Sequence, residues 1–336
     1  MVMAAGLGTR LRPLTDYLPK PIAPVGNRPV LEHLLERIAR AGCSGAIVNL
    51  HHRAEAIVDV IGDGARLGVP VTYSIEDELL GTAGGTRKCA DWLLADDDVF
   101  LVTSGDGLHT IDLAALAADH RASGALATLT VKRVEDVSGF GVVVPDASGR
   151  ITSFQEKPDP SEALSDLVNV GVYCFSRAIF DAIPATGQSD FGSQVLPELV
   201  ARGEDVRVWL TDAYWSDIGS LDELVAANLA IARGEVAVAS HGTLLNGSGD
   251  GVPGINPSAT LHGPVLLGTG ATIGPNAIVE GPTVIGPNAT IHAGAHIRHA
   301  LVLPEADIAS TTSANGGILG AVTQLDGVWA RTHQPV

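Results

Sequence analysis

Short aliphatic runs alternate with helical patterns from the first residues to about residue 235. Four of these runs, AIVNL at 46–50, VTYSI at 71–75, VFLVT at 99–103 and ATLTV at 127–131, are predicted to be buried strands. The clearest helix follows Asn27, with Pro29 in its first turn and Gly42 as its stop. The alternation predicts an α/β domain with a Rossmann-like, mostly parallel sheet flanked by helices. Ligands are therefore expected at the carboxyl ends of the strands.

The segment 141–154 departs from this alternation, because GVVVP, a DASG turn and RITSF together predict a hairpin. We expect this hairpin to form part of a lid or of a ligand pocket. A further strand is predicted at 167–175, and WSDIG at 215–219 leads into a helix from Leu221 to Arg233. These elements complete a predicted first domain over residues 1–235.

The hydrophobic period changes after residue 254. Residues 236–254 are rich in Gly, Ser and other small residues, which predicts a linker. Beyond it an aliphatic side chain recurs every six residues, at Ile255, Leu261, Leu267, Ile273, Val279, Ile285, Ile291, Ile297 and Leu303. Ordinary strands would show a period of two, so the spacing predicts hexapeptide repeats over 255–310 that stack as a short left-handed parallel β-helix. Residues 311–336 show no clear pattern and are expected to be a C-terminal tail.

Charge and composition narrow the classes of partner. The chain has 336 residues, 46% of them hydrophobic and 18% charged, which is a globular composition. Its formal net charge of −17 argues against nucleic-acid or anionic-membrane surfaces, because these require clustered Lys and Arg. Within residues 1–40, however, six basic side chains stand against three acidic ones. We expect small anions to bind at this positively charged region.

Cysteine usage and hydropathy indicate a soluble, cytoplasmic protein. Cys43, Cys89 and Cys174 are odd in number and widely spaced, so they predict neither a disulfide framework nor a cysteine-rich zinc site. No apolar run approaches the roughly 18 residues that a membrane span needs.

A glycine-rich segment opens the positively charged region. Gly6, Leu7, Gly8, Thr9 and Arg10 follow a short apolar lead, and glycines let backbone N–H groups approach a polyphosphate. A second cation, Lys20, lies between two prolines about ten residues further on, where rigid backbone can direct it at another phosphate. The segment is neither a Walker A loop nor a dinucleotide GxGxxG. By itself the glycine pair is better explained by a simple tight turn.

The longer string AAGLGTRLRPLTDYLPKPIAPVGNRP is more specific. It resembles the sugar-1-phosphate nucleotidyltransferases, also called NDP-sugar pyrophosphorylases, whose pattern GxGTRLxPLT followed by PKP is present without a gap. The resemblance implies that Gly6, Gly8, Thr9 and Arg10 hold the phosphates of a nucleoside triphosphate (NTP). It also implies that Lys20 stabilises charge on the α-phosphate, which makes Arg10 and Lys20 the expected catalytic residues.

Further motifs follow in the order found in that family. LGTAGG at 80–85 resembles the segment around the base and ribose, which implies nucleotide-binding roles for Gly81, Thr82 and Gly84. FQEKP at 154–158 resembles the sugar-phosphate segment, where Glu156 accepts sugar hydroxyls and Lys157 pairs with the phosphate. NVG at 169–171 resembles the sugar-contacting Asn-x-Gly, which adds Asn169 and Gly171.

Two aspartates match the metal ligands of the family. Asp106 lies in SGDG after a predicted strand, and Asp217 lies in YWSDIG. Mg²⁺ prefers a few carboxylates together with phosphate oxygens, so this pair suits it. Each aspartate taken alone is better explained by a helix cap or a solvated turn, and the other motifs in order favour the metal role.

The resemblance implies in-line attack by a sugar 1-phosphate on the α-phosphorus of an NTP, with pyrophosphate as the leaving group. The motifs most resemble mannose-1-phosphate guanylyltransferases with a C-terminal β-helix, which implies GTP and mannose 1-phosphate. Glucose-1-phosphate thymidylyl- and uridylyltransferases share nearly all of these motifs and remain an alternative, as does a regulatory, catalytically weak subunit of the same fold. Histidines in the repeats would also permit an acyltransferase, but about three coils are short for an acyl-CoA site. We expect the β-helix to mediate contacts in a homo-oligomer instead.

Overall fold

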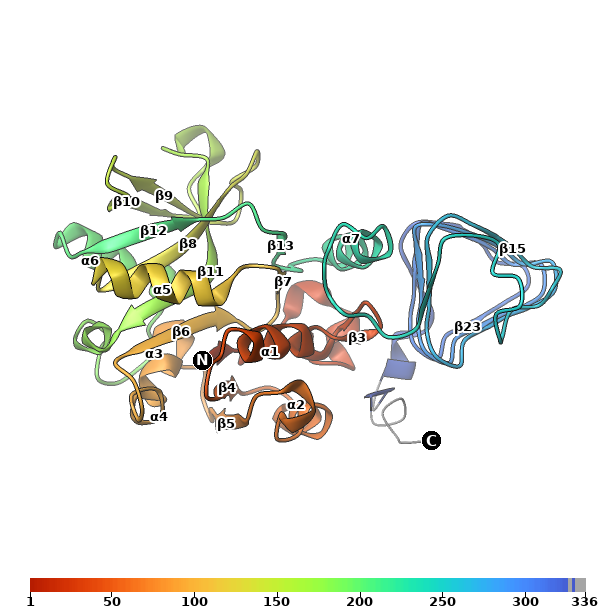
Figure 1. Ribbon diagram of the computed structural model, residues 1–336, viewed down its shortest axis with the longest axis horizontal. Coiled ribbons are helices and arrows are strands. Elements are labelled where there is room, and N and C mark those ends of the chain that lie inside the picture. Colours follow the sequence, from red (N-terminus) through yellow and green to blue (C-terminus); the bar gives the residue numbers. More distant parts are fainter. Residues whose placement is uncertain (326–327, 330–336) are drawn as a thin grey trace.

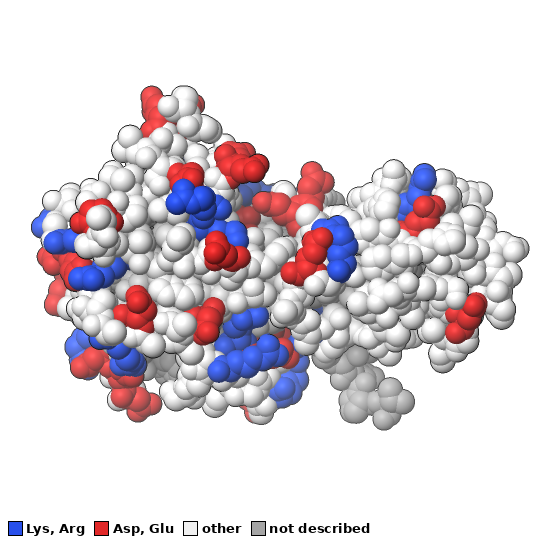
Figure 2. All heavy atoms as spheres, turned by 45° about the horizontal axis from the view of Figure 1, so that its top comes forward, with Lys and Arg blue, Asp and Glu red and all other residues white. Residues whose placement is uncertain are grey.

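The computed structural model describes residues 1–325 and 328–329 (Figure 1). An α/β unit and a triangular β-helix lie next to each other, and helix α7 (Leu221–Ala232) lies between them. Within the described residues, no helix is both long and apolar enough to cross a membrane. The face in Figure 2 mixes acidic and basic side chains over the α/β unit, whereas the visible part of the β-helix carries few charged groups.

The α/β unit is built on a mixed sheet that has nine strands in the part of the chain described here. Its parallel portion consists of β6, β1, β4 and β5 in that order, with bounds Val99–Ser104, Val2–Met3, Ala46–Leu50 and Val71–Ile75. The short β1 lies between β4 and β6 and runs parallel to both. The predicted strands at 46–50, 71–75 and 99–103 are thereby confirmed as strands. The expected burial of 71–75 is wrong, because β5 lies at the edge of the sheet and its Ile75 is 48% exposed.

The other part of the sheet is mainly antiparallel. Strand β11 (Leu167–Ser176) pairs antiparallel with β6 and with β8 (Ala127–Arg133), and β12 (Val206–Leu210) continues from β8 in the parallel sense. The predicted hairpin is confirmed as β9 (Gly141–Pro145) and β10 (Ile151–Glu156). A separate two-stranded ribbon pairs β7 (Leu108–His109) with β13 (Trp215–Ser216). This ribbon brings the segment after Asp106 next to the segment before Asp217.

Helices cover the sheet where the hydrophobic pattern predicts them. Helix α1 (Val30–Arg40) buries Leu31, Leu34, Leu35 and Ile38, and Pro29 is the residue immediately before it. The remaining helices of the α/β unit are α2 (Ala54–Ile61), α3 (Gly81–Lys88), α4 (Ala90–Leu93), α5 (Leu113–Ser123) and α6 (Leu196–Ala201). Asp112 caps α5 by accepting a hydrogen bond from the Ala115 N–H at 2.9 Å. Ser220 caps α7 in the same way through the Glu223 N–H.

The β-helix has three flat faces, each a stack of short strands. One face contains β14 (Thr243–Leu245), β16 (Val265–Leu267), β19 (Thr283–Ile285), β22 (Leu301–Val302) and β25 (Ile318–Leu319). The second contains β15 (Thr260–His262), β18 (Ile278–Glu280), β21 (His296–Arg298) and β24 (Ser313–Asn315). The third contains β17 (Thr272–Ile273), β20 (Thr290–Ile291) and β23 (Asp307–Ile308). The strands are parallel apart from β14, and the six-residue aliphatics point into a buried core.

The register of the repeats changes at the corner after β21. The predicted bounds of the β-helix, 255–310, are wrong at both ends. Val279 pairs with Ile297 eighteen residues later, but Ile285 pairs with Val302, only seventeen residues later. Leu303 is therefore not the structural equivalent of Ile285, although a strict count of six places it there. Because the shortened coil shifts the pattern by one residue, the repeats beyond it are hidden in the sequence. The stack continues past residue 310 as β24 and β25, and β14 occupies part of the predicted linker. Residues 326–327 and 330–336 of the predicted tail lie outside the described residues.

Candidate active site

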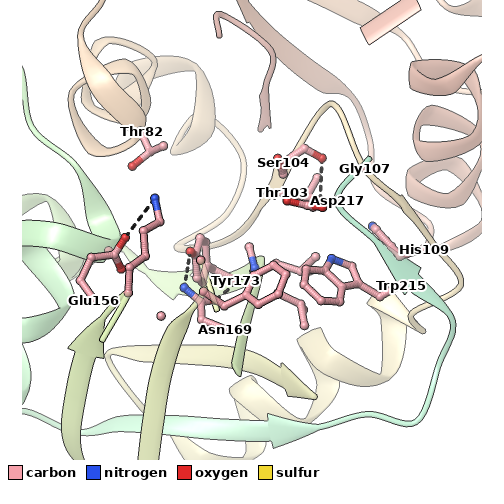
Figure 3. A pocket seen from close by; sticks show the side chains of 18 of the residues that line it. Thr82, Thr103, Ser104, Gly107, His109, Glu156, Asn169, Tyr173, Trp215 and Asp217 are labelled. Carbon is pink, nitrogen blue, oxygen red and sulfur yellow. Dashed lines mark hydrogen bonds and ion pairs between the residues drawn. The ribbon is translucent and has the colours of Figure 1, made fainter. Parts of the chain in front are cut away.

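A cavity of about 200 Å³ opens at the carboxyl end of β6, between the β9–β10 hairpin and the β7–β13 ribbon (Figure 3). The residues predicted for the site that line it are Thr82, Glu156, Lys157, Asn169, Gly171 and Asp217. In Figure 3, Glu156 lies at one end of the cavity and Trp215 and His109 at the other, with Asn169 and Tyr173 between them. The other predicted residues are Gly6, Gly8, Thr9, Arg10, Lys20, Gly81, Gly84 and Asp106. They do not line this cavity, and most of them lie around Lys20 or at the start of α3.

Lys20 joins the two predicted metal ligands. It begins a short 3-10 turn, η3 (Lys20–Ile22), and its side chain is only 6% exposed. The Nζ lies 2.8 Å from Asp106 Oδ2 and donates a hydrogen bond to the backbone carbonyl of Asp217 at 2.9 Å. A buried ammonium requires such partners, because desolvation without them is costly. Three segments that are far apart in the sequence therefore meet at one cation.

The segment around Asp217 is held in an unusual backbone conformation. Ile218, which is β-branched and buried, has a φ of 46°, a region that such residues rarely adopt. The Asp217 carboxylate accepts a hydrogen bond from the Gly219 N–H at 3.1 Å and lies 3.9 Å from the Arg10 guanidinium. Strain of this kind persists where the surroundings fix it, and it concentrates at functional sites. The position of Asp217 is thus determined by its neighbours rather than by local preference.

The glycine-rich segment packs directly on Lys20. A Cβ on Gly8, which has a φ of 64°, would lie 3.1 Å from Lys20 Cβ and 3.2 Å from Thr15 Cγ2. The Thr15 hydroxyl donates to the Gly8 carbonyl at 2.9 Å and closes the turn. Gly6 has no atom within 4 Å of its Cβ position, and Arg10 has a side chain that is 72% exposed. The segment therefore offers open backbone at Gly6 and an exposed cation, Arg10, beside the buried ammonium.

The glycines at the start of α3 are required by packing. A Cβ on Gly81, which has a φ of 75°, would lie 2.3 Å from the Ser189 carbonyl oxygen. That oxygen already accepts the N–H groups of Ala83 and Gly84 at 3.1 Å. Thr82 donates its hydroxyl to Asp190 at 2.7 Å and accepts the Phe191 N–H at 2.8 Å. The first turn of α3 is therefore held firmly against the segment around residue 190, and the nucleotide-binding roles of Gly81, Thr82 and Gly84 stay predictions.

Opposite charges lie at the other end of the cavity. Lys157 follows β10 with a φ of 47°, and its Nζ is 3.6 Å from Glu156 Oε1. Burial raises the pKa of Glu156 above its ordinary value, the nearby Lys157 opposes this shift, and the Asp190 carboxylate reinforces it. Because the Lys157 side chain is 63% exposed, its ammonium is free to approach an anion that enters the cavity.

Asn169 has a fixed orientation on β11. Its Nδ2 donates to the Tyr173 hydroxyl at 2.8 Å, and its Oδ1 accepts the Gly171 N–H at 3.1 Å. Burial raises the pKa of Tyr173, so the phenol stays protonated. The floor of the cavity is thus a neutral, hydrogen-bonded surface that suits hydroxyl groups of a ligand.

Several lining residues were missed by the sequence analysis. Asp190 caps the π-helical turn Phe191–Val195 and contacts Thr82, and its only signal in the sequence is that of an ordinary helix cap. Trp215 lines the cavity with its ring 5.1 Å from Phe140 in an edge-to-face arrangement. Tyr173 and His109 also line it, but neither lies in a motif that the sequence singles out.

The donor set at Asp106 and Asp217 fits a hard divalent cation. Within residues 1–325 and 328–329, no group of three or more His, Cys, Asp or Glu side chains is placed to hold a metal ion. The Asp106 carboxylate and the Asp217 backbone carbonyl meet at Lys20, and Asp106 Oδ1 also accepts the Ser104 hydroxyl. Mg²⁺ is commonly bound by one or two carboxylates together with substrate phosphates and water. The residues present therefore suit Mg²⁺ when phosphate oxygens complete the set.

Comparison with known proteins places the chain in a family. Residues 1–234 match the family model described as Nucleotidyl transferase, and residues 261–335 match the GMPPB C-terminal domain. The chain belongs to the nucleotidyl transferase family, and most of its β-helix lies within the residues that match the GMPPB C-terminal domain.

Two relatives illustrate the similarity. The UTP--glucose-1-phosphate uridylyltransferase of Synechocystis sp. is 39% identical over 70% of this chain and 64% of its own length. The mannose-1-phosphate guanylyltransferase of Mycobacterium tuberculosis is 36% identical over 82% of this chain and 76% of its own. The chain thus spans slightly less than two thirds of the first of these relatives. Among solved structures, HddC from Yersinia pseudotuberculosis complexed with GMP-PN is 25% identical with a TM-score of 0.57, over 68% of this chain and 96% of that one.

Proposed function

We propose that this protein is a sugar-1-phosphate nucleotidyltransferase, which forms an NDP-sugar and pyrophosphate from an NTP and a sugar 1-phosphate. The observation that carries the proposal is the buried Lys20 ammonium between Asp106 and the Asp217 carbonyl, next to a cavity that presents Lys157 at its far end. Two separate cationic groups suit two anionic substrates. Membership in the nucleotidyl transferase family supports the same reaction.

In the proposed reaction, a phosphate oxygen of the sugar 1-phosphate forms a bond to the α-phosphorus of the NTP. The bond from the α-phosphorus to the bridging oxygen breaks, and pyrophosphate leaves with that electron pair. No general base is needed, because the attacking oxygen carries no proton at neutral pH. Lys20 donates to the α-phosphoryl oxygens, where charge builds, and Lys157 holds the attacking phosphate. Arg10, exposed beside the glycine segment, binds the leaving pyrophosphate.

Asp106 and Asp217 are proposed to hold Mg²⁺ when substrates are bound. The ion would neutralise negative charge on the phosphates and so lower the electrostatic cost of bringing two polyanions together. Glu156 and the Asn169 amide then orient the sugar hydroxyls.

GTP and mannose 1-phosphate are the first choice of substrates. The match to the GMPPB C-terminal domain and the relatives named mannose-1-phosphate guanylyltransferase support it. A second candidate is a glucose-1-phosphate uridylyl- or thymidylyltransferase. The uridylyltransferase relative is 39% identical, and a glucose-1-phosphate thymidylyltransferase of Streptomyces antibioticus is 32% identical over 97% of this chain and 92% of its own. Self-association through the β-helix stays a prediction that light scattering of the purified protein can check.

The test is a pyrophosphate-release assay with Mg²⁺ that crosses GTP, UTP, dTTP, ATP and CTP with glucose, mannose and N-acetylglucosamine 1-phosphates. We expect turnover with one or two pairs and the highest kcat/KM with GTP and mannose 1-phosphate. A preference for UTP or dTTP with glucose 1-phosphate would select the second candidate. Absence of turnover with every pair would contradict the proposed activity.

A further inference from the structure

The segment that follows Lys20 is bonded to the C-terminal half of the chain. After η3 the chain forms a small hairpin from β2 (Pro24–Val25) and β3 (Arg28–Pro29). Residues 22–28, which we term the support hairpin, are all buried. Buried backbone groups need hydrogen-bond partners, and several partners of this hairpin come from residues beyond 220.

Trp329 makes the contact nearest to Lys20. Its side chain is 1% exposed, and its Nε1–H donates to the Ile22 carbonyl at 2.7 Å across 307 positions of sequence. Ile22 is the last residue of the turn that begins with Lys20. In that turn the Ala23 N–H bonds to the Lys20 carbonyl at 2.9 Å, and the Ile22 N–H bonds to the Pro19 carbonyl at 3.0 Å. One short hydrogen-bonded turn therefore connects the indole to the lysine.

Four further hydrogen bonds secure the rest of the support hairpin. Asn228 of α7 accepts the Gly26 N–H at 2.9 Å and donates to the Pro24 carbonyl at 3.0 Å. The His241 N–H donates to the Gly26 carbonyl at 3.0 Å. Asn27 Nδ2 donates to the Ile285 carbonyl in the β-helix at 3.0 Å, and both residues are buried. The support hairpin is thus fixed at several points, by helix α7, by His241 in the segment after α7, and by the β-helix.

We propose that Trp329 and Asn27 are positioning residues for Lys20, so that the C-terminal region sets the geometry of the catalytic lysine. The inference rests on the proposed role of Lys20 in nucleotidyl transfer. The physical reason is that a displacement of about 1 Å in a catalytic group can cost about 10²-fold in rate. Lys20 is buried with short contacts on both sides, so a shift of its turn changes its position relative to Asp106. A change in the β-helix reaches Lys20 through Asn27.

Two variants remove one of these hydrogen bonds each. Trp329→Phe keeps an aromatic ring and removes the N–H donor. Asn27→Gly removes the Nδ2 donor and tolerates the φ of 62° at this position. Trp92→Phe is the matched control, because Trp92 is 38% exposed on the short helix α4. For each protein we would measure kcat, both KM values, the thermal midpoint, and hydrogen exchange of peptides that cover residues 19–28.

We expect kcat to fall five- to fifty-fold in Trp329→Phe and in Asn27→Gly, with both KM values within twofold of the starting protein. Hydrogen exchange in 19–28 should accelerate in both variants and stay unchanged in Trp92→Phe. A lower thermal midpoint with unchanged kcat and unchanged exchange would show a merely structural role and overturn the inference. If the starting protein turned over no substrate pair, the proposed function would fail. The exchange data would then decide separately whether Trp329 and Asn27 hold the turn. If one variant did not fold, the other would carry the test.

Discussion

Replacing Lys20 by methionine tests the role of its charge, because the variant removes the ammonium and keeps most of the packing of the side chain. Methionine retains an unbranched side chain of similar length, so it fills most of the space that the 6% exposed lysine occupies. The change removes the contact to Asp106 at 2.8 Å and the hydrogen bond to the Asp217 carbonyl at 2.9 Å. The perturbation therefore acts on the donor aimed at the α-phosphate and leaves the glycine segment packed on an aliphatic stem.

The expected loss in rate follows from the position of the donor. Removing one preorganised donor to a charge that develops in the transition state costs about 3–4 kcal/mol, or about 10²–10³-fold in kcat. The stability cost is smaller. Asp106 is about one third exposed and can be solvated, so we expect a loss of about 1–2 kcal/mol, mainly from the unpaired Asp217 carbonyl. That loss is well below the stability of a typical domain.

The assay compares Lys20→Met with Lys132→Met, a control lysine on β8 that donates hydrogen bonds to the backbone carbonyls of Asp212 and Ala213. Steady-state kcat would be measured at saturating substrates, with circular dichroism to confirm the fold. We expect Lys20→Met to lose at least 10²-fold in kcat and Lys132→Met to stay within twofold. A folded Lys20→Met protein with kcat within fivefold of the starting protein would refute the reasoning.

Three further predictions concern the metal site, the start of α3 and pH. Asp217→Asn keeps the acceptor for its neighbouring N–H but loses the charge, so the Mg²⁺ concentration at half-maximal rate should rise at least tenfold; an unchanged Mg²⁺ titration would contradict a ligand role. Gly81→Ala should destabilise by about 2–4 kcal/mol in denaturant unfolding, since a Cβ would meet the Ser189 carbonyl at 2.3 Å. Gly187→Ala, with a similarly positive φ and open space, should cost only about 1 kcal/mol, and equal losses would argue against the clash. Burial lowers the pKa of His33 from 6.5 to about 4, so the unfolded chain binds more protons in that interval. The free energy of unfolding should therefore be highest above pH 6.5 and fall by about 3 kcal/mol as the pH drops through 4. Unfolding curves at pH 7, 5 and 4 would measure this, and His33→Gln should flatten the dependence.

The hydrophobic pattern predicted the fold well where local preference and burial agree. The apolar run at 46–50 is buried at every position as β4, and the stripe of α1 faces the core. The pattern failed where a single residue changed the register. The turn at Gly281–Pro282 in one coil is one residue longer than the equivalent turn at His299 in the next coil. Because of this difference, the strands beyond residue 310 no longer follow the six-residue count from Ile255.

In the candidate site too, the sequence predicted some residues and missed others. Motif positions such as Lys20, Asp106 and Asp217 meet in space, although no local rule predicts that the Asp217 backbone carbonyl, rather than its carboxylate, would accept the lysine. Asp190 resembled a plain cap because its second contact, to Thr82, spans 108 positions of sequence. The support from Trp329 had no signal at all, since it depends on packing between the two ends of the chain. Contacts of this kind follow from tertiary structure and not from spacing.

Transfer of label from the α-phosphorus of the NTP tests the central claim most directly. The purified chain would be incubated with Mg²⁺, mannose 1-phosphate and GTP labelled at the α-phosphorus, and in parallel with GTP labelled at the γ-phosphorus, with UTP and glucose 1-phosphate as the second pair. The proposed reaction predicts that α-label appears in the NDP-sugar and γ-label in pyrophosphate, in equal amounts. Label that stays in the NTP with every pair, or γ-label released as free phosphate, would contradict nucleotidyl transfer at the site around Lys20.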